Sequence, residues 1–186
     1  RVDLSTNDIA YLPPMKMDNI IDFYISNNSL TTLPESLFNH KYIGMIVVDG
    51  NQLTNLPDTC GSVATTLRYL AVARNNLTQF PTSCQLLKKV ELLDARNNSF
   101  AELPSWFDQL ESLNYLAVSG NPLCYNGWVD GSDNAKVNEL IRNSKDQGCL
   151  RQCSDMCLDI YLENGACDYA CNLPNCNSDN QPCQSM

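Results

Sequence analysis

Apolar and polar positions in the first 124 residues follow one pattern that appears six times. Each copy reads LxxLxLxxNxL, where L stands for an apolar residue and N for asparagine. Its central apolar residues alternate with other residues at a period of two, which predicts a short strand. Successive asparagines are 21, 23, 24, 23 and 23 residues apart, at Asn7, Asn28, Asn51, Asn75, Asn98 and Asn121. The full copies occupy residues 20–30, 43–53, 67–77, 90–100 and 113–123, after a truncated copy at 2–9.

Two features of the pattern indicate how the copies pack. The asparagine follows the strand where the chain must turn, so its amide can bond buried backbone groups of its own turn and of the next coil. A proline that follows Leu or Phe comes six residues after each of the first five asparagines, and it ends strand pairing because it has no N–H. One coil cannot bury its apolar edge alone, whereas stacked coils share a continuous core. The alternative is an unrelated α/β fold with accidental spacing.

Over residues 1–124 these registered copies resemble the leucine-rich-repeat family. The resemblance implies an α/β solenoid with short parallel strands on a concave face and an irregular or 3-10 convex side. We expect six repeats in residues 1–124, a helical C-terminal cap in 125–150 and a cysteine-rich module in 151–186. The first coil opens at Arg1 without a cap, so we expect that upstream sequence is missing or that another molecule covers this coil.

The register also predicts which residues point outward from the concave sheet. They form three columns, and the first two carry an apolar and aromatic track rather than the charged and small polar residues that solvation alone would favour. Exposed aromatic residues of this kind are typical of binding surfaces. The alternatives are an ordinary sheet surface or one covered by a neighbouring part of a longer chain. The candidate partner-binding residues are Tyr24, Met45, Val47, Tyr69, Leu92, Asp94, Arg96 and Tyr115.

Two of the ten cysteines lie inside the repeats. Cys60 and Cys84 each follow a proline by three residues, in the slot that holds Leu37 and Phe107 in other copies. Equivalent positions of adjacent coils lie about one strand spacing apart, within the range for a disulfide. We therefore predict a Cys60–Cys84 bridge, which would stabilise the fold by about 3 kcal/mol in the chain-entropy model. Two buried free thiols are the alternative.

The repeat stops after Leu123, and a helical segment follows at about 133–145. Val137, Leu140 and Ile141 share one face of that helix, which would cover the open last coil. A Cys124–Cys149 bridge would hold this cap, as in the C-terminal caps of secreted leucine-rich-repeat proteins. Trp128 is interpreted as part of the core of the cap rather than as a ligand site.

Six further cysteines at 153, 157, 167, 171, 176 and 183, with the segment NGxCDxxCN at 164–172, are similar to the Notch-type cysteine repeat. The resemblance implies the bridges Cys153–Cys176, Cys157–Cys171 and Cys167–Cys183, although Cys149 could compete with Cys153. It also implies a calcium ion at Asn164, Asp168 and Asp179. Pro182 stands where the family has an aspartate, so a module held by disulfides alone is the alternative. Zinc is less favoured.

Charge and composition narrow the function. The 186 residues carry a net charge of −9, which disfavours nucleic acid, and the single histidine, His40, leaves little for imidazole chemistry. No apolar run is long enough to span a bilayer, and the N-terminus does not resemble a signal peptide. An even number of cysteines and three Asn-x-Ser/Thr sequons predict an extracellular glycoprotein. The expected glycosylation sites are Asn27, Asn76 and Asn97; unused turn residues are the alternative.

These observations favour an extracellular protein-recognition module that binds a peptide or protein on its concave face. The alternative is a structural subunit of an extracellular fibre, wall or surface assembly, in contact with copies of itself. An enzyme is the least favoured class, because no nucleophile, base and orienting group stand out. We expect no catalytic residues and no cofactor other than the candidate calcium ion.

Overall fold

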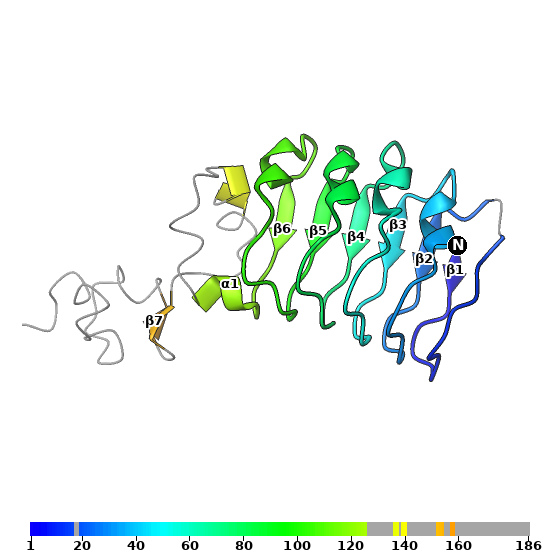
Figure 1. The fold of residues 1–186 in the computed structure, drawn as a ribbon, viewed down its shortest axis with the longest axis horizontal. Helices are drawn as coiled ribbons and strands as arrows, with labels where there is room; N and C mark the ends of the chain where they lie inside the picture. The colour runs from blue at the N-terminus through cyan, green and yellow to red at the C-terminus, as the bar shows by residue number, and fades with distance from the viewer. Residues whose placement is uncertain (17–18, 126–135, 138, 141–151, 155–156, 159–186) are drawn as a thin grey trace, which may run out of the picture.

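The computed structural model describes residues 1–16, 19–125, 136–137, 139–140, 152–154 and 157–158. Its main feature is one parallel sheet of six short strands, whose order in space follows their order in the chain (Figure 1). Each strand begins one coil of a solenoid, so we number the coils one to six. The strands are β1 (Val2–Asp3), β2 (Asp22–Tyr24), β3 (Met45–Val47), β4 (Tyr69–Ala71), β5 (Leu92–Asp94) and β6 (Tyr115–Ala117).

The strand register matches the predicted columns. Met45 pairs with Tyr69, Tyr69 with Leu92 and Leu92 with Tyr115, so equivalent residues of successive copies are direct neighbours. The central residue of each strand points inward, because side chains alternate between the two faces of a strand. From β2 to β6 these inward residues are all buried: Phe23, Ile46, Leu70, Leu93 and Leu116.

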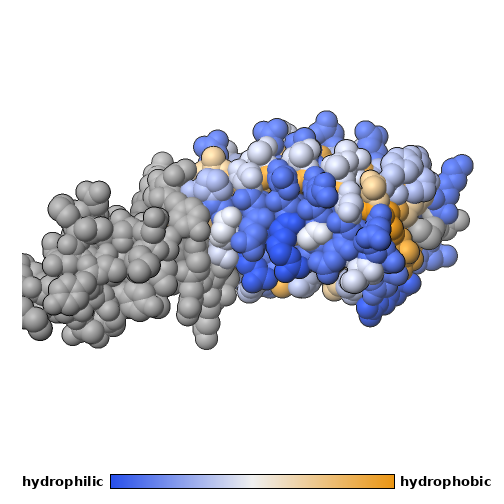
Figure 2. Space-filling model, turned by 90° about the horizontal axis from the view of Figure 1, so that it is seen from below, coloured by the Kyte–Doolittle hydropathy of each residue, from blue (hydrophilic) through white to orange (hydrophobic). Residues whose placement is uncertain are grey.

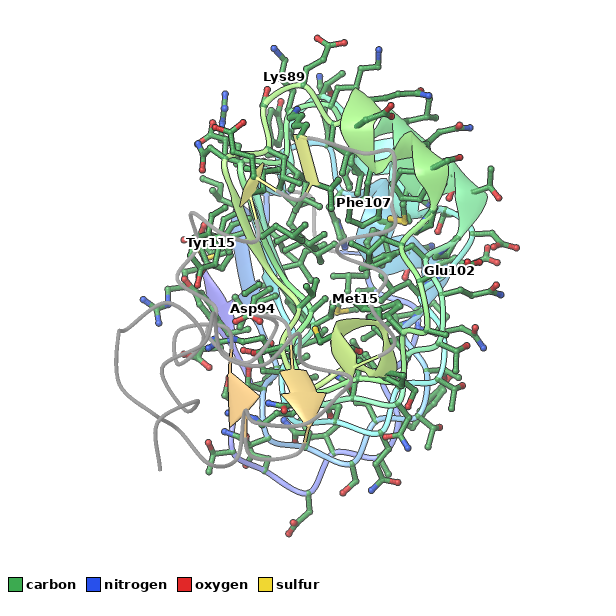
Figure 3. All side chains as sticks on the ribbon, turned by 90° about the vertical axis from the view of Figure 1, so that its left-hand side faces the viewer. Met15, Lys89, Asp94, Glu102, Phe107 and Tyr115 are labelled. Carbon is green, nitrogen blue, oxygen red and sulfur yellow. A yellow bond between two sulfur atoms is a disulfide. The ribbon has the colours of Figure 1, made fainter. Side chains whose placement is uncertain are left out.

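Short 3-10 helices line the side of the solenoid opposite the sheet (Figures 1 and 3). Three of the four begin directly after a proline, which fixes the backbone dihedral φ and has no N–H to extend the preceding segment. Figure 3 shows Phe107 between the helices and the sheet, whereas Glu102 points to solvent. The core therefore lies between the two layers. The helices are η1 (Glu35–Asn39), η2 (Cys60–Val63), η3 (Thr82–Leu86) and η4 (Ser105–Gln109).

A ladder of asparagine side chains connects the coils. The Asn51 amide nitrogen donates to the carbonyl oxygens of Ile25 and Val48, each at 3.0 Å, and its Oδ1 accepts from the Leu30 N–H at 3.0 Å. The amide thus satisfies backbone groups of two successive coils. Asn75, Asn98 and Asn121 are buried and bond in the same way. In the first coil, the amide nitrogen of Asn7 donates within its own coil and the residue is exposed.

The residue before each ladder asparagine adopts a positive φ. This left-handed conformation is favourable for Gly and Asn and less so for other residues. At Gly50 and Gly120 a side chain would also come close to the preceding coil, because a Cβ would lie 2.6 Å from Oδ1 of Asn27 and 2.1 Å from Oδ1 of Asn97. The six positions are Thr6, Asn27, Gly50, Arg74, Asn97 and Gly120.

Cys60 and Cys84 form a disulfide between η2 and η3, and their Cα atoms are 5.2 Å apart. Both cysteines are buried in the core, in the slot that the sequence assigned to them. The neighbouring Gly61 brings the two coils close together, since a Cβ there would lie 2.3 Å from the carbonyl oxygen of Ser83. The bridge therefore joins the third and fourth coils on the helical side.

A short helix, α1 (Pro122–Tyr125), follows the turn of the last coil. Residues 136–137 and 139–140 are helical, as the expected helix at 133–145 requires, and Val137 and Leu140 are buried. The Lys136 ammonium donates to the carbonyl oxygen of Leu110 at 2.7 Å. Cys124 is disulfide-bonded, but its expected partner Cys149 lies outside the described residues.

Most of the C-terminal third also lies outside the described residues. Within it, β7 (Gln152–Ser154) and β8 (Cys157–Leu158) form a small antiparallel pair. The expected core position of Trp128, the remaining helix face at Ile141 and the calcium ligands Asn164, Asp168 and Asp179 fall outside this description. So do the expected bridges of the cysteine module, Cys153–Cys176, Cys157–Cys171 and Cys167–Cys183, which stay predictions.

The ladder generates a prediction for Asn98→Ala. The variant should lose roughly 2–4 kcal/mol of unfolding free energy, because the N–H of Leu77 and the carbonyl groups of Val72 and Ala95 lose a partner. Urea denaturation measures this loss. The matched control is Asn76→Ala at an exposed position of the preceding coil, where the change should stay within about 0.5 kcal/mol. Equal losses in the two variants would contradict the role of the ladder.

The glycines generate a second prediction, for Gly61→Ala and Gly44→Ala. The Gly61 variant should be destabilised by roughly 2 kcal/mol, because its new methyl group must push apart two coils that a disulfide holds together. A Cβ at Gly44 has no neighbour closer than 3.8 Å, so that variant should retain wild-type stability within about 0.5 kcal/mol. Thermal denaturation of both variants distinguishes them, and comparable melting temperatures would show that the close approach at Gly61 does not matter.

Candidate functional site

The outward side chains of β1–β6 and of the residues just after them form one surface, which we call the sheet face. Tyr115 and Asp94 lie on it in Figure 3. The predicted apolar track runs along this surface, and all of its side chains are half-buried rather than buried. They belong to two adjacent columns of the paired strands, so they form a continuous strip. The track consists of Tyr24, Met45, Val47, Tyr69, Leu92 and Tyr115.

Asp94 in β5 and Arg96 just after it form an ion pair on the sheet face. The Arg96 guanidinium binds the carboxylate through two nitrogens, with Nε 2.9 Å from Oδ1 and Nη2 2.6 Å from Oδ2. The Asp94 side chain is only 11% exposed, whereas that of Arg96 is 46% exposed. The sequence proposed both as partner-binding residues. The structure places Asp94 beneath the surface, so Asp94 positions the guanidinium and Arg96 is the group that a partner can reach.

A second carboxylate of the sheet face, Asp49, lies beside small residues of the next coil. The outward-facing Ala71 and Ala73 are buried, and the backbone N–H of Ala73 donates to Oδ1 of Asp49 at 2.8 Å. Burial raises the pKa of Asp49 above its ordinary value, and the negative charge of Asp94 raises it further. Burial also raises the pKa of Tyr69, and both carboxylates add to that effect. The Asp49 carboxylate therefore lies in a weakly solvated part of the sheet face.

At its N-terminal end the track is fixed by contacts of Tyr24. The Arg1 guanidinium lies 4.5 Å from the centre of the Tyr24 ring, a favourable cation–π distance. The Tyr24 hydroxyl lies 2.9 Å from the sulfur of Met45, to which it donates. These contacts hold the ring in one orientation along the strip.

A shallow, open groove of about 690 Å³ runs across the N-terminal ends of the strands. The sequence did not predict this groove. Two of its lining residues are largely exposed, Ile21 at 58% and Tyr42 at 50%. A sequence feature that could have indicated the groove is the residue just before each strand. From β2 to β6 this position holds Ile21, Gly44, Arg68, Glu91 and Asn114, and only Gly44 lacks a side chain. The groove is lined by Ile21, Asp22, Tyr42, Gly44, Met45, Thr65, Thr66, Arg68, Tyr69, Glu91, Leu92 and Asn114.

The three sequon asparagines, Asn27, Asn76 and Asn97, are exposed, as their expected modification requires. They follow β2, β4 and β5 in the chain. Figure 2 shows the solenoid from below. That face is mostly hydrophilic, with hydrophobic residues gathered near the N-terminal end of the solenoid. The sequons therefore lie at the edge opposite the groove, so sugars attached there would leave the groove open.

The described residues offer few groups for metal or acid–base chemistry. Within them, no three His, Cys, Asp or Glu side chains gather closely enough to hold a metal ion. His40 is buried at the end of η1, and its Nε2 has no hydrogen-bond partner among these residues. No described helix has the length and apolar character needed to cross a bilayer.

Comparison with protein families agrees with the geometry. The family model described as leucine rich repeat matches residues 65–123, a range that includes β4, β5 and β6. The structure has six parallel strands in chain order, one per coil, and an asparagine ladder follows them. These features determine the fold. This is a leucine-rich-repeat solenoid.

Known proteins are similar to part of this chain. A leucine-rich-repeat protein of Leptospira interrogans has a structure that superposes with a TM-score of 0.54 at 29% identity, over 56% of this chain and 26% of that one. Ras guanine nucleotide exchange factor V of Dictyostelium discoideum is 31% identical over 119 residues, or 63% of this chain. Transforming growth factor beta activator LRRC32 of Pongo abelii is 46% identical over 67 residues, or 34% of this chain.

The similarity concerns the solenoid rather than whole proteins. The chain spans 5% of the exchange factor and 10% of the growth-factor activator. The matched region is thus a small part of each of those longer chains. The comparisons therefore support a protein-interaction module.

The buried carboxylate generates a prediction for Asp49→Asn. Because its pKa is raised in the fold, Asp49 binds more protons in the folded than in the unfolded state between its ordinary pKa and the raised one. Stability of the wild type therefore falls as pH rises through that interval. The substituted amide keeps an acceptor for the Ala73 N–H without the charge, so the variant should be more stable than the wild type at neutral pH.

Urea denaturation at a series of pH values from about 3 to about 8 tests this expectation. The stability difference between variant and wild type should vanish at the acid end and grow toward neutral pH. Asp58→Asn, at an exposed position outside the sheet face, controls for the change in net charge. A difference that is constant with pH, or larger in acid, would show that burial does not destabilise the Asp49 carboxylate.

Proposed function

We propose that the chain is an extracellular, non-catalytic recognition module that binds a peptide or a protein across its sheet face. One observation carries this proposal. The outward track of Tyr24, Met45, Val47, Tyr69, Leu92 and Tyr115 stays half-exposed on a surface where solvation alone would favour small polar residues. A partner that covers these side chains removes apolar and aromatic surface from water, which is the main source of binding energy at protein interfaces.

The rigidity of this surface supports the proposal. Each strand of the sheet is paired on both sides from β2 to β5, and the asparagine ladder fixes the turn that follows it. Arg96 is held by two bonds to Asp94, and Tyr24 is held between Arg1 and Met45. A partner therefore meets side chains that have already lost much of their conformational freedom, which reduces the entropic cost of association.

Covalent features support an extracellular location. Cys60 and Cys84 form a buried disulfide, and Cys124 is disulfide-bonded as well. Disulfides of this kind persist in oxidising compartments. The exposed sequons at Asn27, Asn76 and Asn97 are suited to glycosylation without disturbing the core.

The track generates a prediction for Tyr69→Ala and Tyr115→Ala. Each variant should weaken association with the partner by about 30-fold or more, because central aromatic residues dominate such interfaces. Folding should stay nearly intact, since both rings are half-buried and lie outside the core. The partner is first captured from the native extracellular fraction and identified by mass spectrometry, and its affinity for each variant is then measured by calorimetry with the purified components.

Tyr11→Ala is the matched control, because Tyr11 is 69% exposed and lies outside the strands. That variant should bind like the wild type. A captured partner whose affinity is the same for all three variants would contradict recognition by the sheet face. Concentration-dependent assembly of the purified chain in light scattering, without any other partner, would favour a structural subunit of a fibre, wall or surface assembly instead.

A further inference from the structure

The groove at the beginning of the strands extends the sheet face beyond the apolar track. Its lining runs from Asp22 in β2 to Asn114 just before β6. In Figure 3 this is the edge of the sheet on the Lys89 side of Tyr115. Five strands about 4.8 Å apart make a groove about 19 Å long, which matches an extended segment of about six residues. Its volume is in the range of ligand pockets, roughly 300–1,000 Å³.

Gly44 leaves open space in this groove. The same position holds Ile21, Arg68, Glu91 or Asn114 in the other coils that line it, and each of those has a side chain. A Cβ at Gly44 would have only the carbonyl oxygens of Thr66 and Ile21 within 4 Å, at 3.8 and 3.9 Å. Its backbone does not require glycine, because no positive φ is present. The gap is therefore room for a side chain that this protein does not supply itself.

The apolar side chains beside this gap are largely exposed to solvent. Ile21 and Tyr42 are two of the four large apolar residues that the described part of the chain leaves mostly exposed. Met45 continues the wall into the apolar track. Large apolar side chains that gather beside an open groove indicate an interaction site. The gap and its walls are suited to a bulky apolar side chain.

The charged residues of the groove indicate which side chain of a partner should lie next to that apolar one. Arg68 and Glu91 form an ion pair across neighbouring coils, so their charges balance each other. Asp22 also lines the groove, and no cationic side chain pairs with it among the described residues. Lys41 lies over the Tyr42 ring, 5.4 Å from its centre, and is not part of the lining. The lining therefore has an excess negative charge, and the weakly solvated carboxylate of Asp49 lies farther along the same face.

We propose that the groove binds an extended, basic segment of a protein partner. One bulky apolar side chain of the segment occupies the gap above Gly44, against Ile21 and Tyr42, and an adjacent lysine or arginine pairs with Asp22. The inference rests on the proposed recognition function and names the chemical class of the partner. Gly44 and Asp22 are then the residues that determine specificity, whereas the aromatic track supplies general affinity.

The probes are two synthetic peptides of six residues with the same leucine and tryptophan positions, one with lysines and one with glutamates between them. Binding to the intact, isotope-labelled chain is followed by amide chemical shifts in NMR titrations. The basic peptide should shift the resonances of Gly44, Arg68 and Tyr69, and the acidic peptide should not. Gly44→Leu, which fills the gap, should weaken the basic peptide about tenfold, and Asp22→Asn should weaken it about threefold and reduce the dependence on salt.

Gly44→Ala controls for folding, because its methyl group fits the space without filling it. Equal binding of both peptides, or wild-type affinity in the Gly44→Leu variant, would overturn the inference. So would a dimer of the chain that Gly44→Leu disrupts, because the occupant would then be a second copy. If Tyr115→Ala weakens the captured partner and Gly44→Leu does not, the sheet-face function stands and only the groove fails. If neither variant affects the captured partner, both proposals fail.

Discussion

The asparagine side chain that closes each strand is the interaction on which the structure depends. A turn after every three-residue strand leaves backbone carbonyls and N–H groups inside the solenoid, where water cannot reach them. One amide per coil satisfies such groups in its own coil and in the coil before it, as Asn51 does for Val48 and for Ile25 and Leu30. The coils are therefore stacked at a fixed distance and in one register. Unsatisfied, the same groups would destabilise the fold by more than its net stability allows.

The fixed register places the functional surface. Since equivalent residues of successive coils become neighbours, six outward residues from five strands form one strip. In the same way Asp94 lies where it can orient Arg96. Small outward residues such as Ala71 and Ala73 deepen the middle of the face and leave Asp49 weakly solvated. The outward positions of the strands determine the chemical character of the sheet face. The inward positions hold buried apolar residues in every coil from β2 to β6, and these maintain the fold.

Sequence reasoning predicted the features that depend on this repetition. The strand columns and the slot shared by Cys60 and Cys84 follow from counting residues, because every coil has nearly the same length. The groove could not be found in that way, since it depends on Gly44 together with Tyr42, which precedes the strand and is outside the columns. The burial of Asp94 was missed because the pattern says which face a residue is on, and not how far a neighbouring Arg96 covers it. The positive φ of the residue before each asparagine was also not predicted. Asn or Gly occupies four of these six positions, but Thr6 and Arg74 occupy the other two, so the sequence shows no uniform preference.

The position of the Cys60–Cys84 bridge has a mechanical consequence. It joins the third and fourth coils on the side away from the sheet, next to the close contact at Gly61, so these two coils cannot separate there. Changes of curvature must then be taken up at the other junctions, toward the Tyr24 end or toward the Tyr115 end. The part of the sheet that these two coils carry, β3 and β4, therefore keeps its spacing when a molecule binds.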